Sequence, residues 1–380
     1  MRNKTTRNND EGRRDWKKTD VQAFSHNCAP SLAVLVTIQD PGYDTPSAPP
    51  TNSLSVAVLT YNLATLTTKI PIPALLSRTS KKPDLIFVTT QETEVLKPRR
   101  TEGRRSVSLR RSVISGSPGY TPVAIHSIGG VQGVLMARDG ARGGLKSVEV
   151  ADVACGVGNV VHNKGGVLVM VTMKGGGRMI FVGCHLAAHQ GKVKERNEDF
   201  RRIREAGEER WGAGVWEDVE GVWWAGDLNY RLDASREEVD CILDGVDGGG
   251  GDKAGRLMEL DQLTEVRMRG EAWGGMVEGR IEFPMTYKLD KNKEGGGRGG
   301  GKGKGKGKGD RWKGLRYDSS AKRRVPSYTD RVLYKPYKLR RGGKKGKEDA
   351  TTECVWYDWI DEDTGSDHKP VAGGFIIRNL

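Results

Sequence analysis

Polar side chains stand at the ends of apolar runs at six places along this sequence. The clearest is WWAGDLNYRL, residues 223–232, where an apolar run reaches Gly226 and is followed by Asp227 and Asn229. Because the strands of a sheet can bring such ends to one edge, we expect these side chains to converge in a single pocket. The other members of the set are Asn62, Glu92, His185, Asp330, Asp367 and His368.

Carboxylates, amides and imidazoles in one pocket favour metal-assisted hydrolysis of a phosphate. Mg²⁺ is held by one or two carboxylates together with water and phosphate oxygens, and the set provides such carboxylates. Zinc is disfavoured because the sequence has no close group of His and Cys ligands. The reaction needs a base for the attacking water, a group that polarises the phosphoryl oxygen and charge that neutralises the leaving group. Taken singly, each residue has an ordinary interpretation as a turn residue, a surface acid or a core histidine, and only the repetition favours a site.

The net charge of +13 on 380 residues points to an anionic partner: nucleic acid, a membrane surface or phosphorylated small molecules. The five cysteines form no CxxC motif, which suits a reducing compartment. The beginning of the sequence has no apolar segment of the signal-peptide kind, and no apolar run is long enough to span a bilayer. We therefore expect a soluble protein on the cytosolic side.

The elements that would position these residues are many strands and few helices. Their spacing is not a regular βαβ alternation, which favours a mixed-sheet α/β sandwich over a doubly wound fold. The most distinct helix lies at 191–211 and is polar enough to be expected on the surface. Strands are expected at 54–63, 83–92, 131–138, 165–173, 178–186, 221–227, 327–335 and 370–378, and short helices at 237–243 and 254–263.

Several segments differ in composition from the rest. Residues 1–52 are polar and basic and then rich in Pro, Ser and Thr, which predicts a disordered leader before a catalytic domain at 53–380. A tract of glycine and lysine at about 291–311 is predicted to be a flexible insertion. The basic stretches at 98–112 and 338–350 are predicted to be solvated loops or, alternatively, contacts with anionic lipid.

Four motifs follow one another in the second part of the chain: WWAGDLNYRL (223–232), FPMTYKLD (283–290), RVPSYTDRVLY (324–334) and SDHKPV (366–371). In this order they resemble the inositol polyphosphate 5-phosphatases of the endonuclease/exonuclease/phosphatase superfamily. The resemblance implies a DNase I-like α/β (α+β) fold, a four-layered sandwich of two mixed β-sheets flanked by helices. It also implies Mg²⁺-dependent removal of the 5-phosphate from phosphoinositides or soluble inositol polyphosphates, by in-line attack of water.

The resemblance also implies roles for individual positions. Asp227 and Asn229 would align the attacking water and hold the scissile phosphate, and His185 would contact that phosphate. His368 would be the catalytic histidine, oriented by Asp330. An Asp–His pair fixes the tautomer of the imidazole and favours its charged form, in agreement with this assignment. The implied metal ligands are Glu92, Asn62 and Asp367, and the implied substrate contacts are Lys164, Tyr287, Lys288, Lys322 and Arg324.

The sequence departs from the family pattern in a few places. Tyr61 stands where the family usually has Trp, and Ser327-Tyr328-Thr329 where it usually has Ala-Trp-Cys, and we expect modest effects. The insertion falls between Lys288 and Lys322, in the region that the family uses for the neighbouring 4-phosphate. Arg231 is expected to give structural support, and Trp223 and Trp224 to lie in the core.

Two other functions stay open from the residues. A nuclease or other phosphodiesterase of the same superfamily is favoured by the net charge and disfavoured by the TYK motif. An inert basic adaptor is disfavoured by the complete polar set. For the leading interpretation we expect phosphoinositide lipids or soluble inositol phosphates as ligands, an anionic membrane surface contacted through the basic loops and no nucleic acid. We also expect a monomer in the cytoplasm, peripheral at membrane surfaces.

Overall fold

The computed structural model describes the chain from Ser53 onward, all of it within one compact unit. The predicted leader at 1–52 lies outside the described residues, as do 291–310 of the predicted insertion and 338–349 of the predicted basic loop. The described ranges are 53–66, 69–94, 103–156, 163–246, 252–290, 311–336, 350–362 and 365–380.

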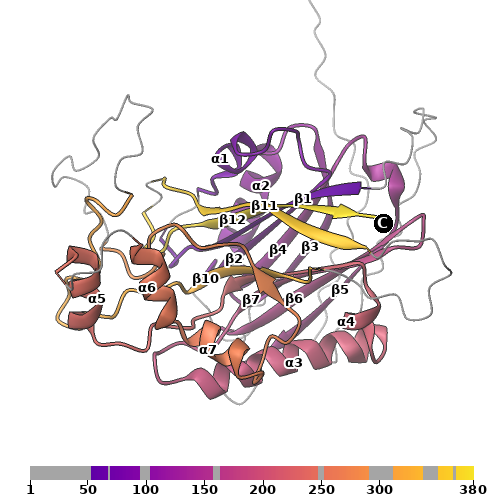
Figure 1. Cartoon of the computed structure of the whole chain (residues 1–380). Coiled ribbons are helices and arrows are strands. Elements are labelled where there is room, and N and C mark those ends of the chain that lie inside the picture. Colours follow the sequence, from indigo (N-terminus) through magenta and orange to yellow (C-terminus); the bar gives the residue numbers. More distant parts are fainter. Residues whose placement is uncertain are drawn as a thin grey trace, which may run out of the picture. The chain divides into compact units, whose positions relative to one another are not determined.

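One six-stranded sheet has the strand order β11-β12-β1-β2-β4-β3 (Figure 1). β1 and β2 are parallel, with Asn62 opposite Gln91, so both strands end at the same edge. β12 runs antiparallel to β1, with Val371 opposite Thr60, and the residues just before β12 therefore lie at that edge too. The strands are β1 (Ser53–Asn62), β2 (Leu85–Gln91), β3 (Tyr120–Ile128), β4 (Val131–Arg138), β11 (Thr351–Trp359) and β12 (Val371–Arg378).

The second six-stranded sheet has the order β5-β6-β7-β8-β10-β9 (Figure 1). β7 and β8 are parallel and end together, with His185 opposite Asp227. β10 is antiparallel to β8 and begins where β8 ends, with Asp330 opposite Asp227. The strands are β5 (Leu145–Ala154), β6 (Gly165–Met173), β7 (Arg178–His185), β8 (Gly221–Asp227), β9 (Val277–Glu278) and β10 (Asp330–Tyr334).

The two sheets pack face to face around the main hydrophobic core. Phe87 of the first sheet meets Phe181 of the second at a ring-centroid distance of 5.5 Å, and Phe181 stacks on Trp223 at 4.9 Å. Two further clusters cover the outer faces, one with α1 and α2 and the other with α3, α4 and α7. The predicted four-layered sandwich is therefore confirmed, and Trp223 and Trp224 are both buried in cores. The helices are α1 (Ile72–Ser77), α2 (Arg104–Ser115), the 3₁₀ helix η1 (Arg142–Gly144), α3 (Val193–Trp211), α4 (Val215–Asp218), α5 (Arg236–Asp244), α6 (Lys253–Glu259) and α7 (Gln262–Met268).

The prediction of a solvated loop at 98–112 is wrong from Arg104 onward, where helix α2 begins. Its buried residues are Ser106, Leu109 and Val113, which recur at helical spacing and form one narrow face toward the first sheet. The arginines between them dominate the composition and conceal this short apolar face. A basic stretch can therefore be an amphipathic helix even when its average hydrophobicity is low.

Two further predictions of secondary structure need correction. The helix expected at 254–263 is two helices, because Asp261 caps the start of α7 by accepting a hydrogen bond from the Thr264 N–H at 2.9 Å. Strands β3, β5, β11 and the two-residue β9 are not among the predicted strands. Each lies at the edge of its sheet, where polar side chains interrupt the apolar run. Among the described residues, no helix is long and apolar enough to cross a membrane.

Candidate active site

The predicted residues at the strand ends converge at one edge of the sandwich. The parallel pairs β1/β2 and β7/β8 end at this edge, and β10 begins there. Asn62, His185, Asp227 and Asp330 are all buried, with no more than 2% of any of them exposed. A polar group at this depth is costly unless it is hydrogen-bonded, so the contacts among these side chains determine the structure of the site.

The amide of Asn62 joins the two sheets. Its Nδ2 donates to Oδ2 of Asp227 at 2.8 Å, across the sandwich, and to Oε1 of Glu92 at 3.3 Å. Its Oδ1 accepts from the Ala64 N–H at 2.9 Å, which fixes the orientation of the amide. Glu92 has a φ of +50°, a left-handed conformation that is costly for a non-glycine residue and is often found at functional sites.

Asp227 and His185 form a buried acid–base pair. Oδ2 of Asp227 lies 3.3 Å from Nε2 of His185, which also contacts Nζ of Lys164. Burial favours the neutral form of each base, so the pKa values of His185 and Lys164 both lie below their usual ranges. Burial alone would raise the pKa of Asp227, but the hydrogen bond from His185 and the nearby positive charges hold it well below the usual range. Asp227 is therefore a carboxylate at neutral pH.

Asn229 is held by its own loop. Its φ is +58°, a conformation that asparagine tolerates better than most residues, and its N–H donates to Oδ1 of Asp227 at 3.1 Å. Its Nδ2 donates to the Leu186 carbonyl at 3.1 Å. Arg231 holds the rest of the residue, because its guanidinium donates to both the side-chain and the backbone oxygen of Asn229. This contact is consistent with the supporting role predicted for Arg231.

Asp330 and His368 form the second acid–base pair of the site. Nδ1 of His368 lies 2.9 Å from Oδ2 of Asp330, which also accepts from the hydroxyls of Thr286 at 2.8 Å and Thr329 at 2.9 Å. Burial would lower the pKa of His368, but the charge and hydrogen bond of Asp330 outweigh it and raise the pKa to about 9. His368 is therefore an imidazolium at neutral pH, with its Nδ1–H directed at Asp330.

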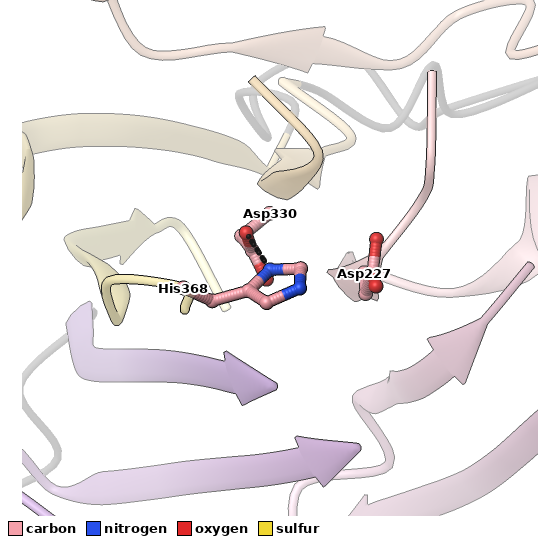
Figure 2. A group of neighbouring side chains, drawn as sticks. All are labelled: Asp227, Asp330 and His368. Atoms are coloured by element: carbon pink, nitrogen blue, oxygen red, sulfur yellow. Dashed lines mark hydrogen bonds and ion pairs between the residues drawn. The ribbon is translucent and has the colours of Figure 1, made fainter. Parts of the chain in front are cut away.

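Figure 2 shows His368 between the carboxylates of Asp330 and Asp227. One ligand atom of each of these three residues lies within 4.8 Å of the others. A protonated imidazole offers no lone pair to a metal, so the charge of His368 favours a role beside a phosphate over metal ligation. The role of His368 as the catalytic histidine stays a prediction.

Oxygen atoms suited to a divalent cation gather around the side chain of Asn62. Glu92 and Asp227 direct their carboxylates at the same amide, that of Asn62. Two acids that converge on one position provide the oxygen chemistry that Mg²⁺ prefers, so these residues fit a hard cation. Asp367, the third predicted ligand, accepts from Nζ of Lys288 at 2.8 Å, and its charge is therefore already balanced. A metal role for Asp367 stays a prediction.

The predicted substrate residues divide into two groups. Lys164 lies inside the site, against His185. The ring centres of Tyr287 and His368 lie 4.5 Å apart. The guanidinium of Arg231 lies over the ring of Tyr287, 4.4 Å from its centre. The second group lies on the segment 317–324: Lys322 is exposed and Arg324 is paired with Asp318 at 3.1 Å.

Sequence reasoning missed the threonines that surround Asp330. Thr286 and Thr329 are completely buried, and both donate to the oxygen that His368 contacts. These two hydrogen bonds fix the side of the Asp330 carboxylate that faces the imidazole. Thr286 is the first residue of the TYK motif and Thr329 directly precedes Asp330, and this was the available signal. A threonine beside a functional residue is, however, common in any sequence.

Comparison with known proteins agrees with this geometry. The family model described as endonuclease/exonuclease/phosphatase family 2 matches residues 59–296 and 308–374. Synaptojanin of Caenorhabditis elegans is 30% identical over 273 residues, 72% of this chain and 21% of that protein. Phosphatidylinositol 4,5-bisphosphate 5-phosphatase A of Mus musculus is 30% identical over 239 residues, 62% of this chain and 21% of its own length. The chain therefore spans about a fifth of the length of these relatives.

Among solved structures, the inositol polyphosphate 5-phosphatase domain of a synaptojanin, in complex with inositol (1,4)-bisphosphate and a calcium ion, has the same fold. Its TM-score is 0.65 at 23% sequence identity, and the match covers 86% of this chain and 85% of that one. The resemblance to inositol polyphosphate 5-phosphatases that the motifs carry is thus confirmed by independent relatives. The chain belongs to the endonuclease/exonuclease/phosphatase family 2.

Proposed function

We propose that this protein is a Mg²⁺-dependent phosphomonoesterase that removes the 5-phosphate of phosphoinositides or soluble inositol polyphosphates. The observation that supports the proposal best is the pair of buried acid–base contacts, His185 with Asp227 and His368 with Asp330, which adjoin one another because ligand atoms of Asp227, Asp330 and His368 lie within 4.8 Å of one another. One pair contains an anion at neutral pH and the other contains a cation. Hydrolysis of a phosphate monoester needs both, an acceptor near the attacking water and positive charge near the phosphoryl oxygens.

The proposed chemistry assigns one task to each side chain. The Asp227 carboxylate accepts a hydrogen bond from the attacking water and takes its proton as the new P–O bond forms. His368 donates from Nε2 to a phosphoryl oxygen, since its Nδ1–H is held by Asp330. Lys164 and His185 would contact the same phosphate, and Asn229 would fix its position. The P–O bond to the inositol ring breaks, the leaving oxygen takes up a proton from water, and Asp227 then releases its proton to water.

Mg²⁺ is the proposed cofactor, held by Glu92 with Asn62 beside it and Asp367 next to the metal. When bound, it would neutralise charge on the phosphate and on the leaving oxygen. The hard oxygen donors of this set support Mg²⁺ over a transition metal. The calcium ion in the related domain supports a divalent cation of the same class.

The substrate class rests on the relatives. One of them is named for phosphatidylinositol 4,5-bisphosphate, and the related domain was solved with inositol (1,4)-bisphosphate. That compound is what remains when inositol 1,4,5-trisphosphate loses its 5-phosphate. A lipid and a soluble substrate are thus both supported.

The location is proposed from the charge of the chain, and the oligomeric state from its single compact unit. The net charge of +13 and the basic stretches at 98–112, 291–311 and 338–350 support association with an anionic membrane surface from the cytoplasm. We propose a monomer that needs no further domain to form its active site, since all the site residues lie in one compact unit.

Cleavage of a phosphodiester, as in nucleases, is the second candidate, because the family model includes endonucleases and the chain is basic. One assay separates the two. The purified chain is given inositol 1,4,5-trisphosphate, vesicles containing phosphatidylinositol 4,5-bisphosphate, and duplex DNA with an abasic site, each with Mg²⁺ and with excess chelator. Phosphate release from either inositol substrate that requires Mg²⁺ supports the proposal. DNA cleavage without phosphate release from either inositol substrate would overturn it.

A further inference from the structure

The loop that carries Lys288 and the loop that carries Lys322 and Arg324 meet at the buried carboxylate of Asp318. Asp318 is 1% exposed and lies between the loop that bears Lys288 and the loop that bears Arg324. Its backbone N–H donates to the Lys288 carbonyl at 3.0 Å. A buried acid at such a junction is costly unless several donors satisfy it.

The side chain of Asp318 folds the second loop back on itself. Oδ2 accepts from the N–H of Arg324 at 3.0 Å and from its guanidinium at 3.1 Å, while Oδ1 accepts from the Ser320 N–H at 3.3 Å. Although burial opposes ionisation, these hydrogen bonds lower the pKa of Asp318 to about 2. The carboxylate therefore closes a turn of seven residues, 318–324, and limits the positions that Lys322, within that turn, can reach.

Arg236, at the start of α5, holds the same loop from outside. Its guanidinium donates to three backbone carbonyls, those of Tyr317 at 3.3 Å, Asp318 at 3.1 Å and Arg324 at 3.3 Å, and its Nε donates to Asp240 at 2.8 Å. The carbonyls of Asp318 and Arg324 are the two ends of the turn. One guanidinium thus fixes the distance between the ends, and Arg is suited to this because its donors form a rigid fork.

We propose that Asp318 and Arg236 are positioning residues that determine how strongly the enzyme binds the phosphate next to the scissile one. Neither residue belongs to the predicted site, and the resemblance to the family names neither. They act through Lys322 and Arg324, whose backbone they hold against the loop of Lys288. Arg324 keeps part of its side chain exposed even while it is paired with Asp318, so it can turn toward a substrate phosphate without unfolding the loop. This inference rests on the proposed function, since it names the residues that shape its substrate selectivity.

The experiment compares two soluble substrates that differ only in the 4-phosphate, inositol 1,4,5-trisphosphate and inositol 1,5-bisphosphate. Asp318→Ala should raise KM for the trisphosphate about 10- to 100-fold, the effect of losing hydrogen bonds to a charged group. It should leave kcat within a few-fold and KM for the bisphosphate unchanged. Asp244→Ala removes the same charge from an exposed position on α5 and should change neither substrate. An equal effect of Asp318→Ala on both substrates, or no effect on either, would overturn the proposal.

Two conservative substitutions test the proposal if Asp318→Ala does not fold. Asp318→Asn keeps an oxygen that can accept from the backbone N–H groups, and Arg236→Lys keeps the charge without the fork. Both should show the same selective rise in KM, but a smaller one than Asp318→Ala. In a Lys322→Ala/Arg324→Ala background, Asp318→Asn should have no further effect, because the residues through which it acts are gone. A full additional effect there would contradict the mechanism.

Direct binding separates a failure of this inference from a failure of the proposed function. Inositol (1,4)-bisphosphate carries the 4-phosphate and has no 5-phosphate to lose, so calorimetric titration measures its affinity without turnover. Asp318→Asn should weaken its binding to the same degree as it raises KM for the trisphosphate. If the wild-type chain binds this compound but hydrolyses neither substrate, the proposed activity fails while the inference is still tested. Unchanged affinity in the variant would overturn the inference alone.

Discussion

His368 Nδ1 lies 2.9 Å from Oδ2 of Asp330, and no more than 5% of either side chain is exposed. Because the pKa of His368 is raised to about 9, its protonation stabilises the folded state fully below its ordinary pKa near ~6.5, and this contribution is lost as the pH rises through about 9. The free energy of unfolding should therefore fall between these pH values in the wild type. Urea unfolding of His368→Gln should lack this fall. A fall of the same size in the variant would assign it to another group.

The protonation of His368 should also determine how kcat depends on pH. If the imidazolium acts on the phosphate, kcat should decrease above pH about 9. Asp330→Asn removes the charge that holds the proton, so this alkaline limb should move toward the ordinary pKa of histidine. A pH profile of the variant that keeps the limb in place would show that Asp330 does not set the protonation of His368.

Asp227→Asn should reduce kcat about 10²- to 10⁴-fold, the range expected for loss of a general base. The amide keeps an oxygen for the Asn229 N–H, so we prefer it to Asp227→Ala, which would leave three buried donors without an acceptor. The thermal midpoint should change by far less than the rate. Asp233→Asn, an exposed acid on the same loop, is the matched control and should leave both unchanged.

Arg231→Gln should lower kcat about 10- to 100-fold, since the guanidinium both holds the Asn229 amide and stacks on Tyr287. Arg231→Lys should recover part of the loss, because it keeps the charge over the ring but not the fork. The test is the ratio of kcat between Arg231→Lys and Arg231→Gln. Equal kcat values would mean that the positive charge at this position does not contribute to the rate.

Arg331→Met, outside the site, should strongly destabilise the fold. Arg331 is completely buried and pairs with Asp261 at 3.0 Å and with Glu278, so its removal leaves two acids without their cation. Breaking a buried pair from one side costs about 3–5 kcal/mol of unfolding free energy. The exposed pair of Arg280 and Glu282 is the control, and Arg280→Met should cost less than about 1 kcal/mol in urea unfolding.

Replacing 291–310 by a short Gly-Ser linker should leave the rate on soluble inositol phosphates unchanged. The positions on either side are already held together, since the Asp290 N–H donates to the Arg316 carbonyl at 2.9 Å and Leu289 pairs with Tyr317. Loss of the basic residues should reduce co-sedimentation with anionic vesicles. Loss of activity on the soluble substrate would show that the replaced segment contributes to the site.

Periodicity was enough to predict the central strands but not the edges. β1, β2, β7 and β8 are buried on both faces and therefore read as apolar runs, whereas β3, β5 and β11 carry polar residues that conceal the strand. Helix α2 was missed for a related reason, because its arginines outweigh the three buried positions that define it. In each case a minority of inward-facing residues determined the structure.

The sequence by itself determined which residues have the chemistry of the site, because Asn62, Asp227 and His368 each stand beside an apolar run whose end is bound to lie at a sheet edge. Only the tertiary structure decided how they pair. The amide of Asn62 lies against Asp227, 165 residues away, and Asp227 pairs with His185, whereas the contact of His368 with Asp330 is the one that the resemblance already implied. Protonation depends on such distances and on burial, since a charge takes its pKa from the groups around it in space. These distances cannot be read from the order of the residues in the sequence.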